Sequence, residues 1–244
     1  MNDYNIQNYY NYFDEYNSIT IFRKKNIKKT NFYCFEGNLR DTSDEILLHH
    51  SPCLIGLIEN MRISKKIIVK DNINNNLLEI VLCNYYNKYI WTIQKKNYQE
   101  LFLISFIHNT LLFKPPIVNL LKKIEKNDIE CTVFNHCVDK KDTLLYKYKK
   151  FLSSKKSKFI TGYDIYHNKV AKYYKDIGCY MLKYDLKKGI PSVKNFIITN
   201  KKDYGENDSI FQFLKVAEDR YVCLYKRPLS LIEAFCVCLT AFYR

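Results

Sequence analysis

Tyr146 and Lys150 lie four residues apart in LLYKYKKFLSSKK, a segment with the composition and periodicity of a helix. Residues four apart are neighbours on a helix surface, so the phenol and the ammonium group share one face. His49, in LLHHSPCLIG, adds a third group, whose unperturbed pKa of about 6.5 suits a base or an acid. Such a set can cleave an RNA-type phosphodiester through its own 2′-hydroxyl without a metal ion.

The register of this set is open, because the histidine is duplicated and tyrosine alternates with lysine in YKYKK. The near alternatives are His50, Tyr148 and Lys149. A chain with 39 Lys+Arg and 22 Tyr also produces Tyr-x-x-x-Lys by chance. An ordinary amphipathic helix and a histidine bonded to the backbone are therefore the competing structural explanations.

The composition is that of a globular protein with an excess of positive charge. Hydrophobic residues make up 47% of the 244 residues, and the formal net charge is +14. This charge favours anionic partners, either nucleic acid or a small phosphorylated ligand. The most apolar stretch, LSLIEAFCVCLTAFY, is too short to span a bilayer and contains Glu233. With no signal-peptide pattern at the start, we expect a soluble intracellular protein that makes no membrane contact.

The sequence lacks the motifs of several enzyme classes. The sequence contains no G-x-x-x-x-G-K-[ST], G-x-G-x-x-G or H-E-x-x-H. The nine cysteines include no C-x-x-C pair, which argues against a zinc site, and an odd count argues against a disulfide scaffold. A cysteine protease using Cys131 or Cys137 lacks a glycine-rich oxyanion turn. We therefore expect no metal and no cofactor, with most thiols buried as small hydrophobic groups.

The expected elements divide the chain into a β-rich half and a mixed half. ITIF and NFYCF flank a basic turn, FRKKNIKK, and KKIIVKD, NLLEIVLCNYYN, KYIWTIQKK and QELFLISFIHN read as further strands. After Pro115–Pro116, IVNLLKKIEKND has helical periodicity, and residues 157–191 read as a three-strand meander. We predict a polar arm (1–20), a β-rich lobe (21–114), an α+β lobe (115–200) and a C-terminal extension without an assigned role (201–244).

The order of these elements resembles the poxin family of metal-independent viral nucleases. His49-His50-Ser51-Pro52 keeps the spacing of His and Pro in the family's catalytic segment, and Tyr146-x-x-x-Lys150 matches its catalytic helix. CTVFN resembles the strand before that helix, and YYKDIGCYMLKYDLKKGIPSVKN resembles the family's closing hairpin. The chain departs from the pattern at Ser51, Cys53 and Lys149, and Asp185 stands where the family has a phosphate-binding arginine.

The resemblance implies a β-rich α+β fold, with a chymotrypsin-protease-like β-barrel half followed by an α+β half. It also implies a homodimer in the host cytoplasm that hydrolyses the 3′–5′ bond of 2′,3′-cGAMP and so antagonises cGAS–STING signalling. Under this hypothesis His49 and Tyr146 move protons, and Lys150 stabilises the developing charge. Lys183 and Lys187 would hold the substrate phosphates.

Two alternative hypotheses describe a protein without catalytic activity. One is a basic viral protein of transcription or replication, which would bind long nucleic acid through its charge and exposed aromatic side chains. The other is a relative of the poxins that binds the cyclic dinucleotide without cleaving it, an idea that Asp185 supports.

Overall fold

Alternation of residues along a strand determines which face of the strand is buried. In β2 (Lys29–Glu36) and β4 (Lys66–Asp71) every second residue is buried and most of the residues between them are exposed or half-buried, with Phe35 at the end of β2 as an additional buried residue. Successive side chains of a strand point to opposite faces, so each strand offers one apolar face to a common interior. A long series of such strands can bury these faces by closing on itself, which also removes the exposed edges.

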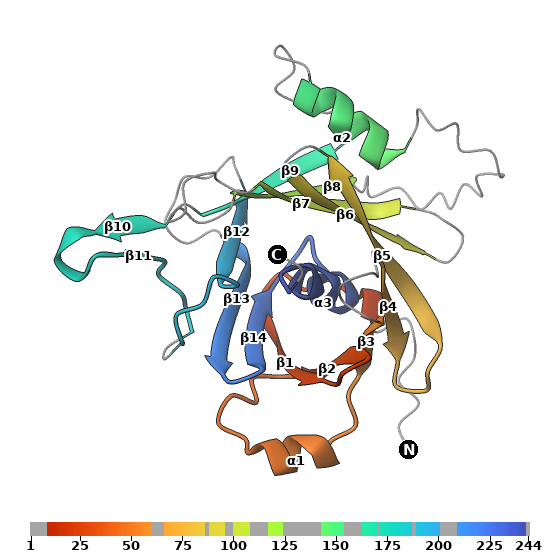
Figure 1. Cartoon of the computed structure of the whole chain (residues 1–244), viewed down its shortest axis with the longest axis vertical. Helices are drawn as coiled ribbons and strands as arrows, with labels where there is room; N and C mark the ends of the chain where they lie inside the picture. The colour runs from red at the N-terminus through yellow and green to blue at the C-terminus, as the bar shows by residue number, and fades with distance from the viewer. Residues whose placement is uncertain are drawn as a thin grey trace.

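The computed structural model describes residues 9–59, 66–85, 88–95, 100–107, 117–123, 143–153, 163–169, 171–186, 189–200 and 209–242. Within these residues, twelve antiparallel strands form one closed barrel, in the order β1-β14-β13-β12-β9-β8-β7-β6-β5-β4-β3-β2 (Figure 1). Besides β2 and β4, the barrel strands are β1 (Asn17–Lys25), β3 (Leu54–Glu59), β5 (Asn76–Tyr85), β6 (Lys88–Lys95), β7 (Glu100–Ile107), β8 (Ile117–Lys123), β9 (Tyr163–Asn168), β12 (Phe196–Asn200), β13 (Ser209–Ala217) and β14 (Arg220–Tyr225).

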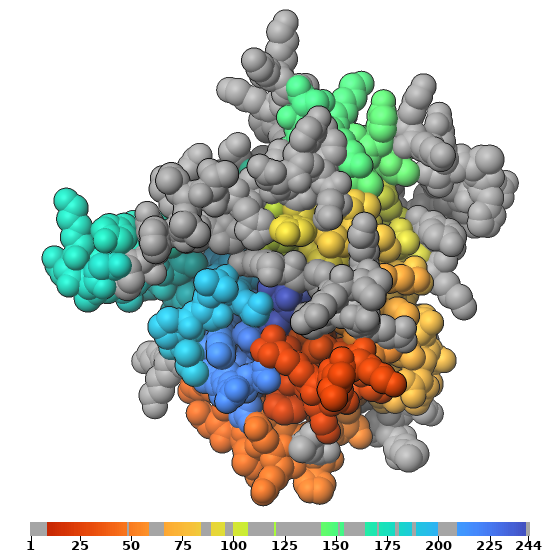
Figure 2. Space-filling view, in the orientation of Figure 1, coloured from red at the N-terminus to blue at the C-terminus, as the bar shows by residue number. Residues whose placement is uncertain are grey.

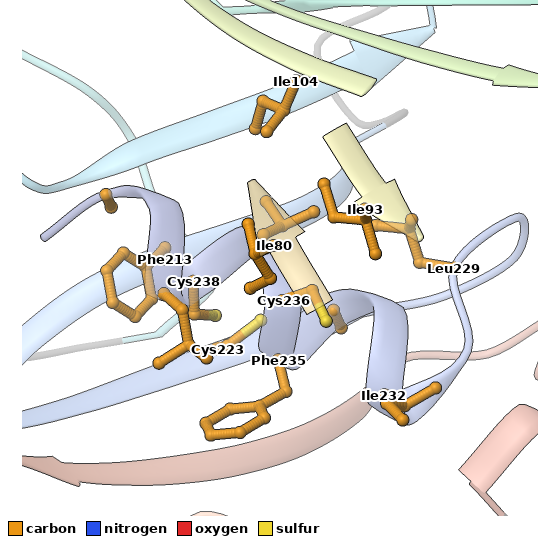
Figure 3. Close-up of a cluster of buried hydrophobic side chains, with 14 of the residues drawn as sticks. Ile80, Ile93, Ile104, Phe213, Cys223, Leu229, Ile232, Phe235, Cys236 and Cys238 are labelled. Carbon is orange, nitrogen blue, oxygen red and sulfur yellow. The ribbon is translucent and has the colours of Figure 1, made fainter. Parts of the chain in front are cut away.

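Helix α3 (Leu231–Thr240) lies inside the barrel (Figure 1). All ten of its residues are buried, as expected for a helix that is apolar on every side. Figure 3 shows Ile232, Phe235 and Cys236 of α3 among inward side chains of the surrounding strands, such as Ile80 and Ile93. The core of the protein is therefore this helix and the wall around it.

Local features fix α3 in place. Ser230 and Glu233 form a capping box at its start, which satisfies backbone donors that the first turn leaves without partners. Gly56 of β3 lets the helix come close, because a Cβ at this position would lie 2.7 Å from Cδ1 of Leu239. At the far end of the helix, the Phe242 ring packs edge-on against Tyr221, with ring centroids 4.7 Å apart.

The barrel has two distinct ends. The hairpin end carries the β1–β2 turn (residues 26–28), the β13–β14 turn (residues 218–219) and the connection from β9 to β12. The entry end, where the chain passes from β14 into α3, carries the β4–β5 turn (residues 72–75). The strands alternate in direction around the whole barrel, so this assignment follows from the register alone.

Among the described residues, several short elements lie outside the barrel. They are α1 (Asp44–His49), α2 (Leu144–Ser153) and the separate hairpin of β10 (Lys172–Tyr174) and β11 (Cys179–Met181), which the 3₁₀ turn η3 (Lys175–Ile177) joins. Arg220 tethers the α1 loop by donating to the backbone carbonyls of Arg40 and Thr42 and pairing with Asp44. The outer elements are thus attachments to the barrel wall.

The predicted fold class is wrong. The chain does not divide into a chymotrypsin-like barrel half and an α+β half, because strands from both halves of the sequence close one barrel around α3. Residues 201–244, which the sequence left without a role, supply β13, β14 and the central helix. The helix expected over IVNLLKKIEKND is also wrong, since its first seven residues form β8, paired with β7 and β9. The Pro115–Pro116 seam lies outside the described residues.

Several local predictions are confirmed. The strands expected on both sides of FRKKNIKK are β1 and β2, and the helix expected over LLYKYKKFLSSKK contains α2. The turn expected near residues 176–178 joins β10 to β11, with Gly178 in the left-handed conformation at φ +62°. The expected burial of thiols holds for Cys34, Cys53, Cys223, Cys236 and Cys238.

Candidate anion-binding site

The residues expected to form a catalytic set do not come together. His49 ends α1, and Tyr146 and Lys150 lie on α2, with the barrel between the two helices (Figure 1). His49 and Lys150 are exposed, and Tyr146 is 42% exposed. His50, the alternative to His49, follows α1 and is also exposed. No register of the histidines places an imidazole beside the Tyr/Lys face.

Tyr148, the alternative to Tyr146, anchors α2 to the barrel. Its side chain is fully buried in a small cluster with Ile90, Leu103 and Leu144. Its hydroxyl and that of Ser105 lie 2.6 Å apart in a hydrogen bond. The Tyr148 side chain therefore has a structural role in packing α2 against the barrel. Lys149, the alternative to Lys150, is half-buried on the same helix.

The residues expected to bind substrate phosphates lie after β11. Lys183 is exposed, and Lys187 lies outside the described residues. Asp185 faces Gln212 of β13: its backbone N–H donates to Oε1 at 3.0 Å, and Nε2 of Gln212 donates to its carboxylate. These bonds attach the segment to the outer wall of the barrel, which gives Asp185 a structural role.

The described part of the chain has a strong concentration of positive charge at the β1–β2 turn. We define the basic tip as Lys24, Lys25, Lys28 and Lys29 together with Ile27. All five are exposed, and Ile27 is fully so at 106%. The turn is closed by the backbone N–H of residue 26, which donates to the carbonyl of Lys29 at 2.8 Å. The sequence thus places four ammonium groups around one exposed aliphatic side chain.

The charges of the basic tip are available to a ligand. Among the described residues, none of its four ammonium groups forms an ion pair with a carboxylate or donates a hydrogen bond to another group. Arg23, next in the strand, differs: its guanidinium pairs with Asp219 and lies over the Phe242 ring, 5.3 Å from the centroid. The arginine therefore stabilises the end of the barrel, and the lysines beyond it face solvent.

Two shallow hollows adjoin the basic tip. One lies within the turn itself, between Lys25 and Lys29. The other is lined by Phe22, Arg23, Lys24, Lys25, Asp44, Glu218 and Asp219. The second contains three carboxylates, so an anion is favoured at the outer, lysine side of the tip. Neither hollow is enclosed in the way that a pocket for small-molecule chemistry is.

The described residues contain no group of three or more His, Cys, Asp and Glu side chains that could hold a metal ion. Across the same residues, no helix is long and apolar enough to cross a membrane.

The Tub family matches residues 3–244 of the chain. Tubby-like F-box protein 11 of Oryza sativa subsp. japonica is 31% identical over 80 residues, which is 31% of this chain and 20% of that protein. Tubby-related protein 1 of Homo sapiens is 36% identical over 76 residues, covering 31% of this chain and 14% of that protein. Tubby-like F-box protein 3 of Arabidopsis thaliana is 29% identical over 86 residues, covering 33% and 21%. The aligned segments therefore span only about a fifth of these relatives, or less.

These matches overturn the poxin interpretation. The resemblance rested on a few short motifs, whereas the Tub match covers residues 3–244 and agrees with the barrel. The predicted hydrolysis of 2′,3′-cGAMP is wrong, as are the enzyme assignment and the cyclic-dinucleotide partner, because all three came from the poxin resemblance that the Tub match replaces. The homodimer and the binding-only poxin relative were implied by that resemblance and lose their support with it.

The basic tip was visible in the sequence but received no role. FRKKNIKK stood out as a basic turn between two strands. The chain has 39 Lys and Arg residues, so four lysines in one turn do not by themselves indicate a site. What the sequence could not show is that Ile27 stands fully exposed among them.

Proposed function

The chain belongs to the Tub family, and we propose that it is a non-enzymatic protein that binds phosphoinositide headgroups at a membrane surface through its basic tip. Proteins of this family bind phosphoinositides and DNA. The observation that carries the proposal is the basic tip itself, with four exposed lysines around Ile27. Each lysine offers a compact positive charge with three donors, which suits phosphate oxygens.

The exposed isoleucine favours a membrane over nucleic acid. An aliphatic side chain has no flat face on which a base can stack, so Ile27 adds little to a nucleic-acid surface. At a bilayer it can enter the boundary between headgroups and acyl chains while the lysines stay at headgroup level. Ile27 and the lysines thus fit one ligand surface.

The magnitudes predict weak, salt-sensitive binding. A lysine near an anionic membrane contributes about 1 kcal/mol, so four contribute about 4 kcal/mol. This corresponds to a dissociation constant of about 1 mM, which burial of Ile27 and a multiply charged headgroup would strengthen. Because the charges are exposed, salt should weaken the binding steeply.

The proposed site of action is the host cytoplasm. The cytoplasmic leaflet is the anionic one, and it attracts basic surface segments. This location rests on the proposed ligand.

DNA or RNA is the second candidate ligand. The observation that favours it is the formal net charge of +14, much of which lies away from the basic tip. A nucleic-acid binder would spread its contacts over many lysines and lose affinity with salt for any long duplex.

Vesicle co-sedimentation tests the proposal. The probes are phosphatidylcholine vesicles alone, the same vesicles with phosphatidylserine, and vesicles with a bisphosphorylated phosphoinositide at equal total charge. We expect the phosphoinositide vesicles to bind most tightly. Removing two tip charges with Lys25→Ala/Lys28→Ala should weaken that binding about 30-fold.

The matched control removes two lysines elsewhere. Lys149→Ala/Lys150→Ala changes the net charge equally on α2, and the affinity should stay within about twofold, since screening acts over about 8–10 Å. Equal losses of affinity from both double variants would mean that binding depends on the net charge of the protein and not on the basic tip. Tight binding to duplex DNA without vesicle binding would replace the proposal by the second candidate.

A further inference from the structure

The β10–β11 hairpin stands apart from the barrel. Its three pairs, Lys172↔Met181, Tyr173↔Tyr180 and Tyr174↔Cys179, form a two-stranded sheet that shares no strand with the barrel. Figures 1 and 2 show it projecting sideways beyond the rest of the molecule. An isolated two-stranded hairpin is marginally stable in water. Packing of the barrel core therefore does not explain which residue types occur in this hairpin.

Large apolar side chains are exposed on this hairpin. Tyr173 is 53% exposed, Tyr174 48%, Ile177 59% and Met181 47%. The register places Tyr174 and Met181 on one face of the sheet together with Lys172, and Ile177 stands in the turn. A concentration of exposed apolar residues on one projecting element is a feature of interaction sites.

Positive charge accompanies these apolar residues. Lys172 and Lys175 lie in the hairpin and Lys183 just after it, all exposed, against one carboxylate, that of Asp176. Tyrosines flanked by lysines are typical of the boundary between membrane and water, where the ring is half-buried and its hydroxyl stays hydrated. The composition of the hairpin thus matches an anionic interface.

The hairpin leaves the barrel from the same end as the basic tip. β9 runs toward the hairpin end, where Asn168 pairs with Ile198, and β12 begins there at Phe196. The connection between these strands contains β10 and β11. Both projections at this end therefore carry an exposed isoleucine, Ile27 or Ile177, beside lysines.

We propose that the β10–β11 hairpin inserts Ile177, Tyr173 and Tyr174 into the interface of an anionic lipid bilayer, as a second membrane contact in addition to the basic tip. The inference rests on the proposed function, binding to a membrane. It adds to the basic tip a second contact that needs anionic lipid but no phosphoinositide. A folded protein partner would favour a groove or an unbroken apolar patch. Here the apolar residues alternate with lysines along a narrow hairpin, which suits a fluid anionic surface better.

An introduced tryptophan reports insertion directly. The chain contains one tryptophan, Trp91, which is fully buried in β6 and serves as an internal reference. Ile177→Trp is mixed with phosphatidylcholine/phosphatidylserine vesicles that contain brominated acyl chains, which quench indole fluorescence on contact. The matched control is Ile73→Trp, at a residue 72% exposed in the β4–β5 turn of the entry end.

We expect blue-shifted and quenched fluorescence from Ile177→Trp and no change from Ile73→Trp. Vesicle binding without quenching of Ile177→Trp would overturn the inference and leave the basic tip as the membrane site. No binding to any vesicle would overturn the proposed function and this inference with it. Quenching by single-stranded oligonucleotide in place of vesicles would also overturn it, since the aromatic side chains would then stack on bases.

Affinity provides an independent measurement. Ile177→Asp should weaken binding to these vesicles about tenfold, because it removes buried methylene groups and adds repulsion from anionic lipid. Ile73→Asp makes the same change at the entry end and should leave the affinity unchanged. Equal affinities of the two variants would contradict insertion of the hairpin.

Discussion

The interior of the barrel and its hairpin end use isoleucine in opposite ways. Inside, residues such as Ile80, Ile93 and Ile232 are fully buried around or on α3. At the hairpin end, Ile27 and Ile177 stand exposed among lysines. The interior residues stabilise the fold through burial, and the two exposed residues cannot. The comparison teaches that residue type alone does not separate structural from functional positions in this chain.

The two regions should therefore respond oppositely to substitution. A change in the interior should lower stability and leave ligand contacts of the folded protein intact. A change at the exposed residues Ile27 or Ile177 of the hairpin end should leave stability intact and alter binding.

The largest expected effect is on the barrel interior. Phe235→Ala removes a fully buried ring of α3 and should lower the free energy of unfolding by about 3–5 kcal/mol, because a cavity remains that the closed wall cannot fill. Ile27→Ala removes a fully exposed side chain and should change it by less than about 0.5 kcal/mol. Urea unfolding followed by Trp91 fluorescence measures both. Similar losses of unfolding free energy from the two variants would contradict the distinction between interior and exposed residues.

A smaller effect is expected where the helix and wall approach most closely. Gly56→Ala places a methyl group 2.7 Å from Cδ1 of Leu239, and we expect a loss of about 1–3 kcal/mol. The clash is with one side chain, so Leu239→Ala should cost less in the Gly56→Ala background than in the wild type. A double-mutant cycle measures this coupling. Additive losses would mean that the wall moves instead of the side chain.

The sequence predicts the barrel wall well and the closure badly. Alternation in KKIIVKD and the apolar runs of NLLEIVLCNYYN and KYIWTIQKK locate β4, β5 and β6, because the period of two is a local signal. Closure depends on pairs such as Ile21↔Tyr221, which join residues two hundred positions apart and leave no local trace. The role of LSLIEAFCVCLTAFY was missed for the same reason: its burial depends on strands distant in the chain.

The basic tip was only partly predictable. The sequence located FRKKNIKK between two strands, and the turn is where it was expected. The catalytic prediction failed because helical spacing holds only within one helix: Tyr146 and Lys150 share α2, but nothing in the sequence measures the distance from there to His49. The helix prediction for IVNLLKKIEKND failed because a short apolar run is compatible with both a strand and a helix. Pairing with β7 and β9 makes its first seven residues a strand.

The smallest expected effect lies between the two regions, where α2 attaches to the wall. The carboxylate of Glu100 in β7 accepts the backbone N–H of Leu144 at the start of α2. Burial raises the pKa of Glu100 above its ordinary value, and the helix N–H groups and Lys147 only partly oppose this shift. Desolvation of the charged form therefore outweighs the favourable contacts.

The sign of the pH effect follows from that pKa. A raised pKa means that folded protein binds the proton more tightly than unfolded protein, so ionisation of Glu100 costs stability as pH rises through its pKa. Glu100→Gln keeps an acceptor for Leu144 without the charge. It should raise the free energy of unfolding near neutral pH by less than the ~1 kcal/mol typical of a helix cap. The gain should shrink as pH falls below the folded pKa and Glu100 of the wild type becomes neutral. Urea midpoints of both proteins across the acid range measure it, and a gain that grows toward low pH would show that the charged cap stabilises α2 after all.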